Sequence, residues 1–296
     1  MAGHDSRVYN DTSMITLPEE EYILTKAYVP EHIVSLMALI SKGDPFLIED
    51  YLGFAKDNWL ILVGYPLEKS FSIERCERVL ERALSSYKPE VLWFIGPEIP
   101  SSLSNISTER EADQYFTFDM EITKPKTSLL RVAEKASMEL EIERSHSFSK
   151  EHEGLVAEFL KREKLSPRLR ELYLAMPRYV PQSKSSCVLS ARDRKGRLSA
   201  FYVVDLAAKG FATYLLGCYS KKNCVPHASD LLFYKMIDLT REAGKGTINL
   251  GLGVNDGIRR FKEKWGGVPT LRYVFCEAHY GFTRMASLIR DLAERL

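Results

Sequence analysis

The chain has 296 residues, 45% of them hydrophobic, which is enough apolar material for two globular domains. Its start is polar and its longest apolar runs are far too short to cross a bilayer, so we expect neither a signal peptide nor a membrane span. Five scattered cysteines, an odd number, fit reduced thiols in a cytoplasm better than a disulfide framework.

The charges are distributed unevenly around a net value of +1 at pH 7. Residues 1–150 carry 16 Lys and Arg against 25 Asp and Glu, whereas residues 151–296 carry 25 against 15. A basic C-terminal half favours an anionic ligand there, such as coenzyme A, a nucleotide-linked sugar or tRNA. Attraction between an acidic and a basic half explains the same pattern, and charge alone leaves both interpretations open.

The first half of the chain predicts two strands joined by a helix. Residues 59–65 and 91–95 are β-prone apolar runs, and residues 72–87 between them place apolar side chains at helical spacing, with Ser72 as the N-cap. This order predicts a parallel pair with a right-handed crossover. Around it we expect a loose arm or entering strand at 1–20, a helix at 30–41, a turn at 43–45, a serine-rich loop at 100–107 and a strand at 114–120.

The second half predicts a longer series of helices and strands. It follows a turn at 123–126, where we place the boundary between domains 1–124 and 125–296. Residues 187–192 and 198–204 flank a polar turn and predict a hairpin. The other expected elements are helices at 127–140, 149–164, 228–242 and 281–296 and strands at 141–144, 211–219, 247–250 and 271–275.

One stretch near the end combines a glycine turn, a short basic helix and a glycine stop. Ile258, Phe261 and Trp265 share one face of the predicted helix, which leaves Lys262 on the face expected to meet solvent. Gly266 and the glycine after it end the helix, because glycine accepts the left-handed conformation at a helix C-terminus.

This stretch resembles the GNAT-like acyltransferase superfamily. Residues 257–267, GIRRFKEKWGG, are similar to the pattern G-(L/I)-x-x-F-K-x-K-(F/W)-G-G of the Fem-type peptidoglycan aminoacyltransferases. Looser similarity covers about the last 170 residues. The resemblance implies an α/β (α+β) fold of two GNAT-like domains, each a mixed, mostly antiparallel sheet flanked by helices, with the N-terminal domain as a degenerate copy.

The resemblance also implies roles for the motif residues. N-acetyltransferases place a proton-donating Tyr where this chain has Phe261, which has no proton to give. In Fem-type enzymes the Phe-Lys pair lies at the aminoacyl end of the tRNA, and the Lys stabilises the developing oxyanion. Lys262 takes that role by resemblance, with Asn255 and Phe261 contacting the donor. The alternative is that Lys262 is a solvated lysine on a basic helix.

The segment before the long helix, residues 220–229, contains no glycine. N-acetyltransferases cradle the coenzyme A pyrophosphate there with a glycine-rich loop, and Fem-type enzymes lack that loop. Lys221 and Lys222 are the candidates for contacting donor phosphates, and an ordinary charged turn is the alternative. Asp205, which ends a central strand, is the candidate base, or else a strand-end turn residue. The three strand tyrosines, Tyr202, Tyr214 and Tyr219, are mostly expected in the core, and a pocket is the alternative position for one of them.

The sequence therefore predicts an acyltransferase or aminoacyltransferase. It moves an acyl group from an anionic donor, aminoacyl-tRNA or acyl-CoA, to the amine of a peptide or small molecule, with tRNA as a candidate partner. We expect no metal, because the Cys and His residues lack the paired spacing of a metal site. The alternative is a catalytically silent GNAT-like protein that binds a ligand or partner, because fold alone does not decide between them.

Overall fold

The computed structural model describes residues 15–68 and 70–280, and the chain divides into two compact units. Unit 1 comprises Met1–Glu21, Gly43–Glu111 and Phe275–Leu296, and unit 2 comprises Tyr22–Lys42 and Ala112–Val274. The chain passes between these units four times, after residues 21, 42, 111 and 274, and none of these crossings lies at residue 124. The protease-sensitive boundary expected there stays a prediction. The final helix expected at 281–296 lies outside the described residues.

Unit 1 contains the predicted parallel pair and two strands that the sequence did not reveal. Its strand order is β1-β2-β3-β4-β11, with β1 to β3 antiparallel and β3 parallel to β4. The hydroxyl of Ser72 accepts the backbone N–H of Arg75 and so caps α3, as predicted. The elements are β1 (Asp44–Ile48), β2 (Tyr51–Lys56), β3 (Trp59–Val63), α3 (Ile73–Tyr87), β4 (Val91–Gly96) and α4 (Ser101–Ser104).

The expectation of a turn at 43–45 is wrong, since β1 begins at Asp44. Pro45 is tolerated because β1 ends the strand order of the unit, where a proline removes no bond between central strands. The loose arm or strand expected at 1–20 is wrong for its last residues, because helix α1 spans Leu17–Lys26. Residues 1–14 lie outside the described part of the chain. The loop expected at 100–107 contains the single turn of α4.

Unit 2 is built on a mixed, mostly antiparallel sheet with the order β11-β5-β10-β9-β8-β7-β6. The predicted hairpin is confirmed as β7 and β8, and β9 and β10 run parallel because α8 connects them. The strands are β5 (Ser107–Asp119), β6 (Leu140–Ser145), β7 (Ser186–Asp193), β8 (Leu198–Asp205), β9 (Phe211–Tyr219), β10 (Thr247–Leu252) and β11 (Val268–His279).

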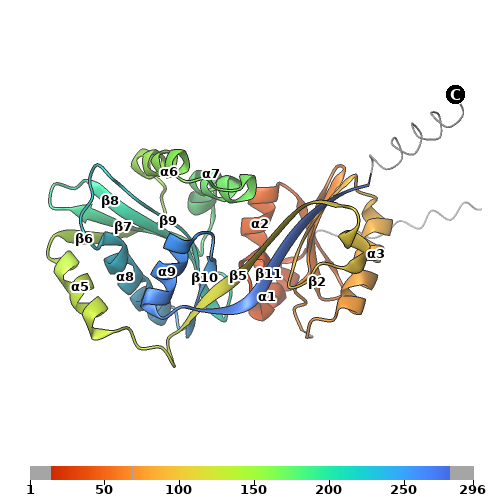
Figure 1. Cartoon of the computed structure of the whole chain (residues 1–296), viewed down its shortest axis with the longest axis horizontal. Coiled ribbons are helices and arrows are strands. Elements are labelled where there is room, and N and C mark those ends of the chain that lie inside the picture. Colours follow the sequence, from red (N-terminus) through yellow and green to blue (C-terminus); the bar gives the residue numbers. More distant parts are fainter. Residues whose placement is uncertain (1–14, 69, 281–296) are drawn as a thin grey trace, which may run out of the picture. The chain divides into compact units, whose positions relative to one another are not determined.

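Helices cover both faces of the unit 2 sheet (Figure 1). On β8, Phe201 and Val203 enter one apolar cluster while Tyr202 and Val204 enter the other, because side chains alternate along a strand. One face carries α2 (Val34–Ser41), α6 (Lys150–Arg162) and α7 (Pro167–Gln182), and the other carries α5 (Thr127–Ser137), α8 (Ala228–Glu242) and α9 (Asp256–Trp265).

Helix α7 has no counterpart in the sequence-based prediction. It contains Pro177 and Pro181, and proline normally interrupts a helix by removing a donor and crowding the preceding turn. The burial of Tyr173, Met176 and Val180 against the sheet and α6 stabilises the helix despite these residues. No helix within residues 15–68 and 70–280 is long and apolar enough to span a membrane.

The side chain of His152 is buried in unit 2 at the start of α6. Its Nδ1 accepts the backbone N–H of Ser149, so the ring proton lies on Nε2, which donates to the hydroxyl of Ser190. Burial, with the nearby charge of Arg192, lowers the pKa of His152 from 6.5 to about 4. The imidazole therefore cannot take the proton of Ser190, and its position is structural.

We expect His152 to make the protein less stable as the pH falls from 6.5 to 4. In that window the unfolded chain binds a proton that the folded chain excludes, so the free energy of unfolding decreases by up to about 3 kcal/mol. In His152→Gln the amide can still accept the Ser149 N–H, and this part of the pH dependence should be lost. Urea unfolding of both proteins at several pH values measures it. Parallel pH curves for the two would contradict the prediction.

Candidate functional site

Strands β9 and β10 part within β10, shortly before the predicted motif. They pair over only three positions, the last being Asn249 with Thr213, although β9 continues to Tyr219 and β10 to Leu252. The neighbouring ladders are irregular here, with register shifts at Val203/Val204 of β8 and after Asn249 of β10. Bulges and the carboxyl ends of diverging parallel strands are common places for ligand sites.

The turn after β10 is strained and tightly held. Val254 has a φ of 61°, the left-handed region that a β-branched residue seldom enters. Its N–H donates to Oδ2 of Asp113 on β5 at 2.9 Å. Asn255 then caps α9, with Oδ1 accepting the N–H of Ile258 at 2.9 Å. The side-chain oxygen of Asn255, expected to contact the donor, is therefore occupied by the helix.

Lys262 is buried, contrary to the expectation that it meets solvent. It is 4% exposed, its ammonium donates to the carbonyl of Leu252, and it lies 5.7 Å from the ring centroid of Phe116. Burial lowers the pKa of Lys262 to about 7, while the carboxylate of Asp113 opposes that shift. A lysine with this pKa can hold or release a proton near neutral pH.

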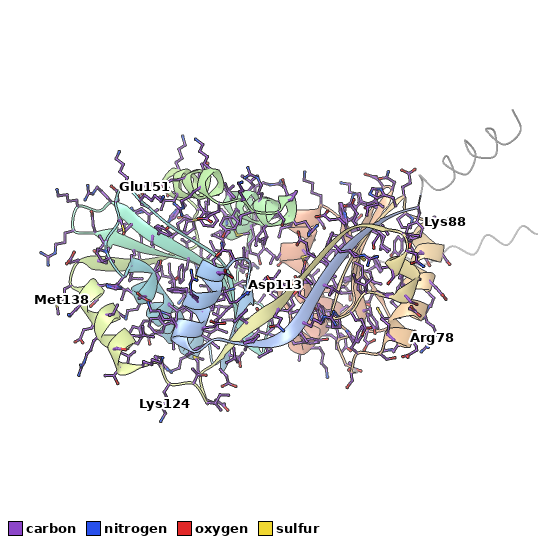
Figure 2. All side chains as sticks on the ribbon, in the orientation of Figure 1. Arg78, Lys88, Asp113, Lys124, Met138 and Glu151 are labelled. Atoms are coloured by element: carbon purple, nitrogen blue, oxygen red, sulfur yellow. The ribbon has the colours of Figure 1, made fainter. Side chains whose placement is uncertain are left out.

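Asp113, labelled in Figure 2, is a site residue that sequence reasoning missed. It receives the Val254 N–H, lies near the ammonium of Lys262 and so joins β5 to the motif. The only sequence signal is an acidic residue in a predominantly polar strand segment. Its relation to Lys262 arises from the pairing of β5 with β10, which the sequence does not display.

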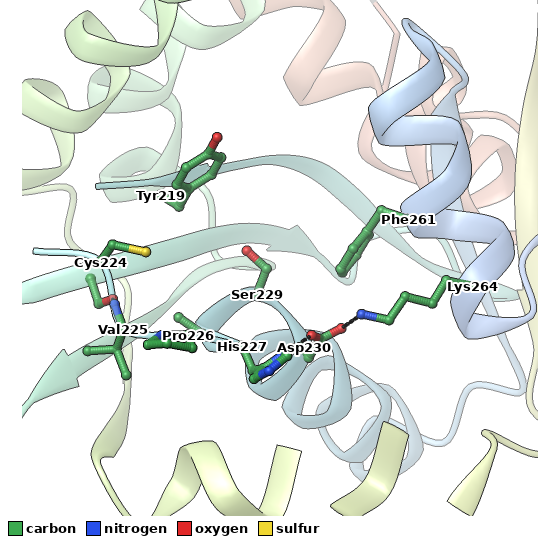
Figure 3. Close-up of a pocket in the computed structure, with 11 residues that line it drawn as sticks. Tyr219, Cys224, Val225, Pro226, His227, Ser229, Asp230, Phe261 and Lys264 are labelled. Atoms are coloured by element: carbon green, nitrogen blue, oxygen red, sulfur yellow. Dashed lines mark hydrogen bonds and ion pairs between the residues drawn. The ribbon is translucent and has the colours of Figure 1, made fainter. Parts of the chain in front are cut away.

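A pocket of about 250 Å³ opens beside the motif helix (Figure 3). Phe261 contributes one wall and also packs against Phe233 of α8, with ring centroids 5.8 Å apart. Tyr219 from the end of β9 contributes another wall, while Tyr202 and Tyr214 pack in the core. This agrees with the expectation that one strand tyrosine lines a pocket. Other lining residues are Ser199, His227, Ser229 and Lys264.

The first turn of α8 brings Asp230 to the same pocket. Oδ1 accepts hydrogen bonds from Lys264 at 2.5 Å and from the indole of Trp265 at 2.9 Å, and Oδ2 lies 3.0 Å from Nδ1 of His227. Burial opposes ionisation, but these partners outweigh it and hold the pKa of Asp230 below its usual value. The carboxylate therefore ties α8 to α9 and offsets the positive end of the α8 dipole.

Comparisons of sequence identify no relative: no family model matches the chain, and no curated protein matches it. Solved structures share its fold over most of its length. FemX superposes with a TM-score of 0.62 at 11% identity, covering 88% of this chain and 96% of that one. L-PGS from Bacillus licheniformis has a TM-score of 0.56 at 16% identity, covering 95% and 98%.

A tandem GNAT protein from the clavulanic acid biosynthesis pathway superposes with a TM-score of 0.55 at 11% identity, covering 91% of this chain and 96% of that one. The fold is GNAT-like and of the Fem type. The GNAT-like fold that the motif led us to expect is therefore confirmed, with the motif helix α9 directly after β10.

Asp205, the predicted base, lies at the end of β8 and not in the pocket. It is fully buried, and Oδ2 accepts the hydroxyls of Tyr179 at 2.7 Å and Ser185 at 3.0 Å. Oδ1 accepts the N–H of Ala207 at 2.7 Å. With both oxygens occupied, this position favours a structural role for Asp205 in the GNAT-like fold, joining α7 to the sheet.

Lys221 and Lys222 are exposed in the connection between β9 and α8. The backbone N–H of Lys221 donates to Glu158 of α6 at 3.0 Å, and neither side chain lines the pocket. The structure thus brings Phe261 to the pocket, buries Lys262 beside the strained turn and leaves the two lysines on the surface. Within the described residues, no cluster of three or more His, Cys, Asp and Glu is arranged to hold a metal ion.

Trp265 and Lys262, one turn apart on α9, should affect stability in opposite ways. Trp265 is 1% exposed and stacks on Phe233 at 4.7 Å, so Trp265→Ala should cost roughly 3–5 kcal/mol. Lys262→Met removes a buried charge and keeps the stem, so it should unfold no more easily than the wild type at pH 7. Chemical denaturation measures both changes.

The difference in stability between Lys262→Met and the wild type should depend on pH in a definite direction. Between pH 7 and 10.5 the unfolded wild-type chain holds a proton that the folded chain has released, so wild-type stability rises with pH. The advantage of Lys262→Met should therefore shrink across that range. A large loss of stability in the variant at pH 7 would mean that the Lys262 hydrogen bond outweighs its burial.

Proposed function

We propose that this protein transfers an acyl or aminoacyl group from an anionic donor, aminoacyl-tRNA or acyl-CoA, to the amine of a peptide or small molecule. The observation that carries the proposal is the burial of the Lys262 ammonium beside the strained turn at the end of β10. A buried cation costs stability, so its retention in a Phe-Lys motif of the Fem type favours a chemical role.

The chemistry needs a fixed positive charge. When an amine attacks an acyl ester or thioester, the carbonyl oxygen becomes negative before the alcohol or thiol leaves. The ammonium of Lys262 has three N–H donors, of which the carbonyl of Leu252 takes one. A donor held in a dry site stabilises that oxygen more than water does, because the surrounding dielectric is low and the group is already oriented. Asp113 supports the charged form.

The start of α8 favours aminoacyl-tRNA over acyl-CoA as the donor. Residues 220–229 contain no glycine, so they offer no tight backbone cradle for a pyrophosphate. Asp230 places a carboxylate in the first turn of α8, where it repels a second anion. The proposal assigns the phosphates of an RNA to Lys221 and Lys222 instead, and their exposure in the preceding connection supports this.

A catalytically silent binding protein is the second candidate. Phe261 has no proton to offer a leaving group, and the ammonium of Lys262 donates its hydrogen bond to a backbone carbonyl of the protein, that of Leu252. In such a protein the motif would serve only the fold. Turnover with any charged tRNA or acyl-CoA separates this candidate from the first.

We expect coenzyme A and acetyl-CoA to bind weakly and charged tRNA to bind tightly. Calorimetric titration of the full chain with each of the three measures this, with the same tRNA in uncharged form as the control. An affinity for acetyl-CoA in the micromolar range, roughly −8 kcal/mol, would contradict the prediction and make acyl-CoA the donor.

Lys262→Met should lower turnover on the order of a hundredfold or more, as loss of other oxyanion donors does. Lys245→Met is the matched control, because Lys245 is also a buried lysine of unit 2 that donates to a carbonyl, that of Ala208, away from the motif. It should retain activity in any fraction that folds. The first readout is hydrolysis of the donor, which needs no acceptor.

The pH profile separates the two roles open to Lys262. If the charged form stabilises an oxyanion, wild-type turnover should fall as the pH rises above about 7, because the ammonium loses its proton there. Turnover that instead rises through pH 7 in the wild type, and not in Lys262→Met, would make Lys262 a base and refute the oxyanion role.

A further inference from the structure

Tyr219 presents an aromatic ring at the open side of the pocket. It is the last residue of β9, it is 42% exposed, and it lines the pocket of about 250 Å³ together with Phe261 of α9. Figure 3 shows the two rings reaching from different elements, with Ser229 between them in that view. A large exposed ring beside a pocket is a surface on which a flat ligand can stack.

Arg162 lies against this ring. Its guanidinium carbon lies 4.5 Å from the Tyr219 ring centroid, within cation–π range. The arginine is only 16% exposed, and Nε lies 3.1 Å from Glu163. Both terminal nitrogens are buried without a hydrogen-bond acceptor, although Nη1 lies 3.7 Å from Glu158. The guanidinium is therefore held against the ring more than it is used for hydrogen bonding.

The connection beside Tyr219 is held by the same residues. Glu158, which faces Arg162, also accepts the backbone N–H of Lys221. Tyr219 is thus anchored by its strand, by the guanidinium and by the residues that follow it. A ring ordered before binding loses little further entropy when a ligand stacks on it.

We propose that this pocket binds the adenine ring of the acyl donor, stacked on Tyr219 with Phe261 as the second wall. The proposal rests on the proposed function, since both donor classes carry an adenosine. A pocket of about 250 Å³ is smaller than those that enclose whole drug-sized ligands and fits one ring system. Ser229 and Lys264 supply polar atoms at its edge, where the ring nitrogens of adenine can accept hydrogen bonds.

The position of the pocket selects between the two sources of adenosine. In aminoacyl-tRNA the acyl group is attached to the ribose that carries the terminal adenine, so base and ester are neighbours. In acyl-CoA the adenine is separated from the thioester by the pyrophosphate and the pantetheine arm. Phe261 lines the pocket, whereas Lys262, the next residue of α9, does not. An adenine in the pocket and an acyl group near Lys262 would then lie beside one turn of the same helix, which matches the compact geometry of the tRNA terminus.

The test uses the full chain and an uncharged RNA hairpin ending in CCA, compared with the same hairpin lacking the terminal A. We expect the CCA hairpin to bind more tightly to the wild type, with the difference largely lost in Tyr219→Ala. Stacking of one base on an aromatic ring corresponds to a loss of roughly five- to a hundredfold in affinity. Tyr219→Phe keeps the ring and should retain the difference.

Tyr234→Ala is the matched control. Tyr234 is a half-buried tyrosine of α8 with the ammonium of Lys235 5.4 Å from its ring centroid, and it does not line the pocket. Its loss should leave discrimination between the two hairpins intact, and melting temperatures show whether each variant is folded. Two results would overturn the proposal that an RNA adenine stacks on Tyr219. One is equal binding of both hairpins by the wild type, and the other is full discrimination between them by a folded Tyr219→Ala variant.

Coenzyme A and 4′-phosphopantetheine, which lacks the adenosine part, provide the second arm. Tight binding of coenzyme A that is lost both in Tyr219→Ala and on removal of its adenosine part would keep the adenine pocket and refute tRNA as the donor. Aminoacyl transfer whose KM is the same in wild type and Tyr219→Ala would have the reverse meaning: the proposed function would stand, and the adenine pocket would be refuted.

Discussion

The three-residue pairing of β9 with β10 is the constraint on which the site depends. After Asn249 the backbone groups of the two strands no longer hydrogen-bond to each other, although both strands continue for several residues. Buried backbone polar groups need partners, and here the partners are side chains. Lys262 donates to the carbonyl of Leu252, and Asp113 accepts the N–H of Val254. The residues that complete the backbone at the parted strands are therefore the same ones that place a charge there.

This double use has a consequence for the reaction proposed above. A substrate oxygen that receives a hydrogen bond from Lys262 competes with the carbonyl of Leu252, or else uses one of the other N–H donors of the ammonium. The second course leaves the backbone satisfied throughout the reaction and requires no movement of α9. It also keeps the charge oriented before the substrate arrives, which is the condition under which electrostatic stabilisation is most effective.

Much of unit 2 could be predicted from sequence because its signals are local. The bounds of β9 and α8 agree with their predicted ranges, and Asn255 and Gly266 mark the start and end of α9. The buried face of α9 was only half predicted. A helical wheel finds the apolar face with Phe261 and Trp265. The side of α9 that carries Lys262 is also buried, beside Phe116 of β5. That second contact depends on strand pairing, which has no local signal.

The misses elsewhere have the same origin. The prolines of α7 argue against a helix, and packing against the sheet decides otherwise. Asp113 and Val254 are 141 residues apart and meet only because β5 lies beside β10. Arg162 and Tyr219 meet because α6 covers the face of the sheet that includes β9. Local patterns therefore located the motif, whereas the partners that tune it came from the fold.

The two buried lysines of unit 2 differ in how far their ammonium groups are committed to the fold. Burial lowers the pKa of both, but Lys245 donates to two backbone carbonyls, those of Ala208 and Lys209, and is thereby committed to the fold. Lys262 donates to one carbonyl, and its other neighbours are an aromatic ring and the Asp113 carboxylate.

The turn that provides the Leu252 carbonyl is itself strained, because Val254 has a φ of 61°. Strain of this kind costs on the order of 1–3 kcal/mol and persists only where surrounding contacts enforce it. Here Asp113 enforces it by holding the Val254 N–H. The protein thus accepts a strained turn and a buried charge at one place, and both keep an under-coordinated ammonium beside the parted strands.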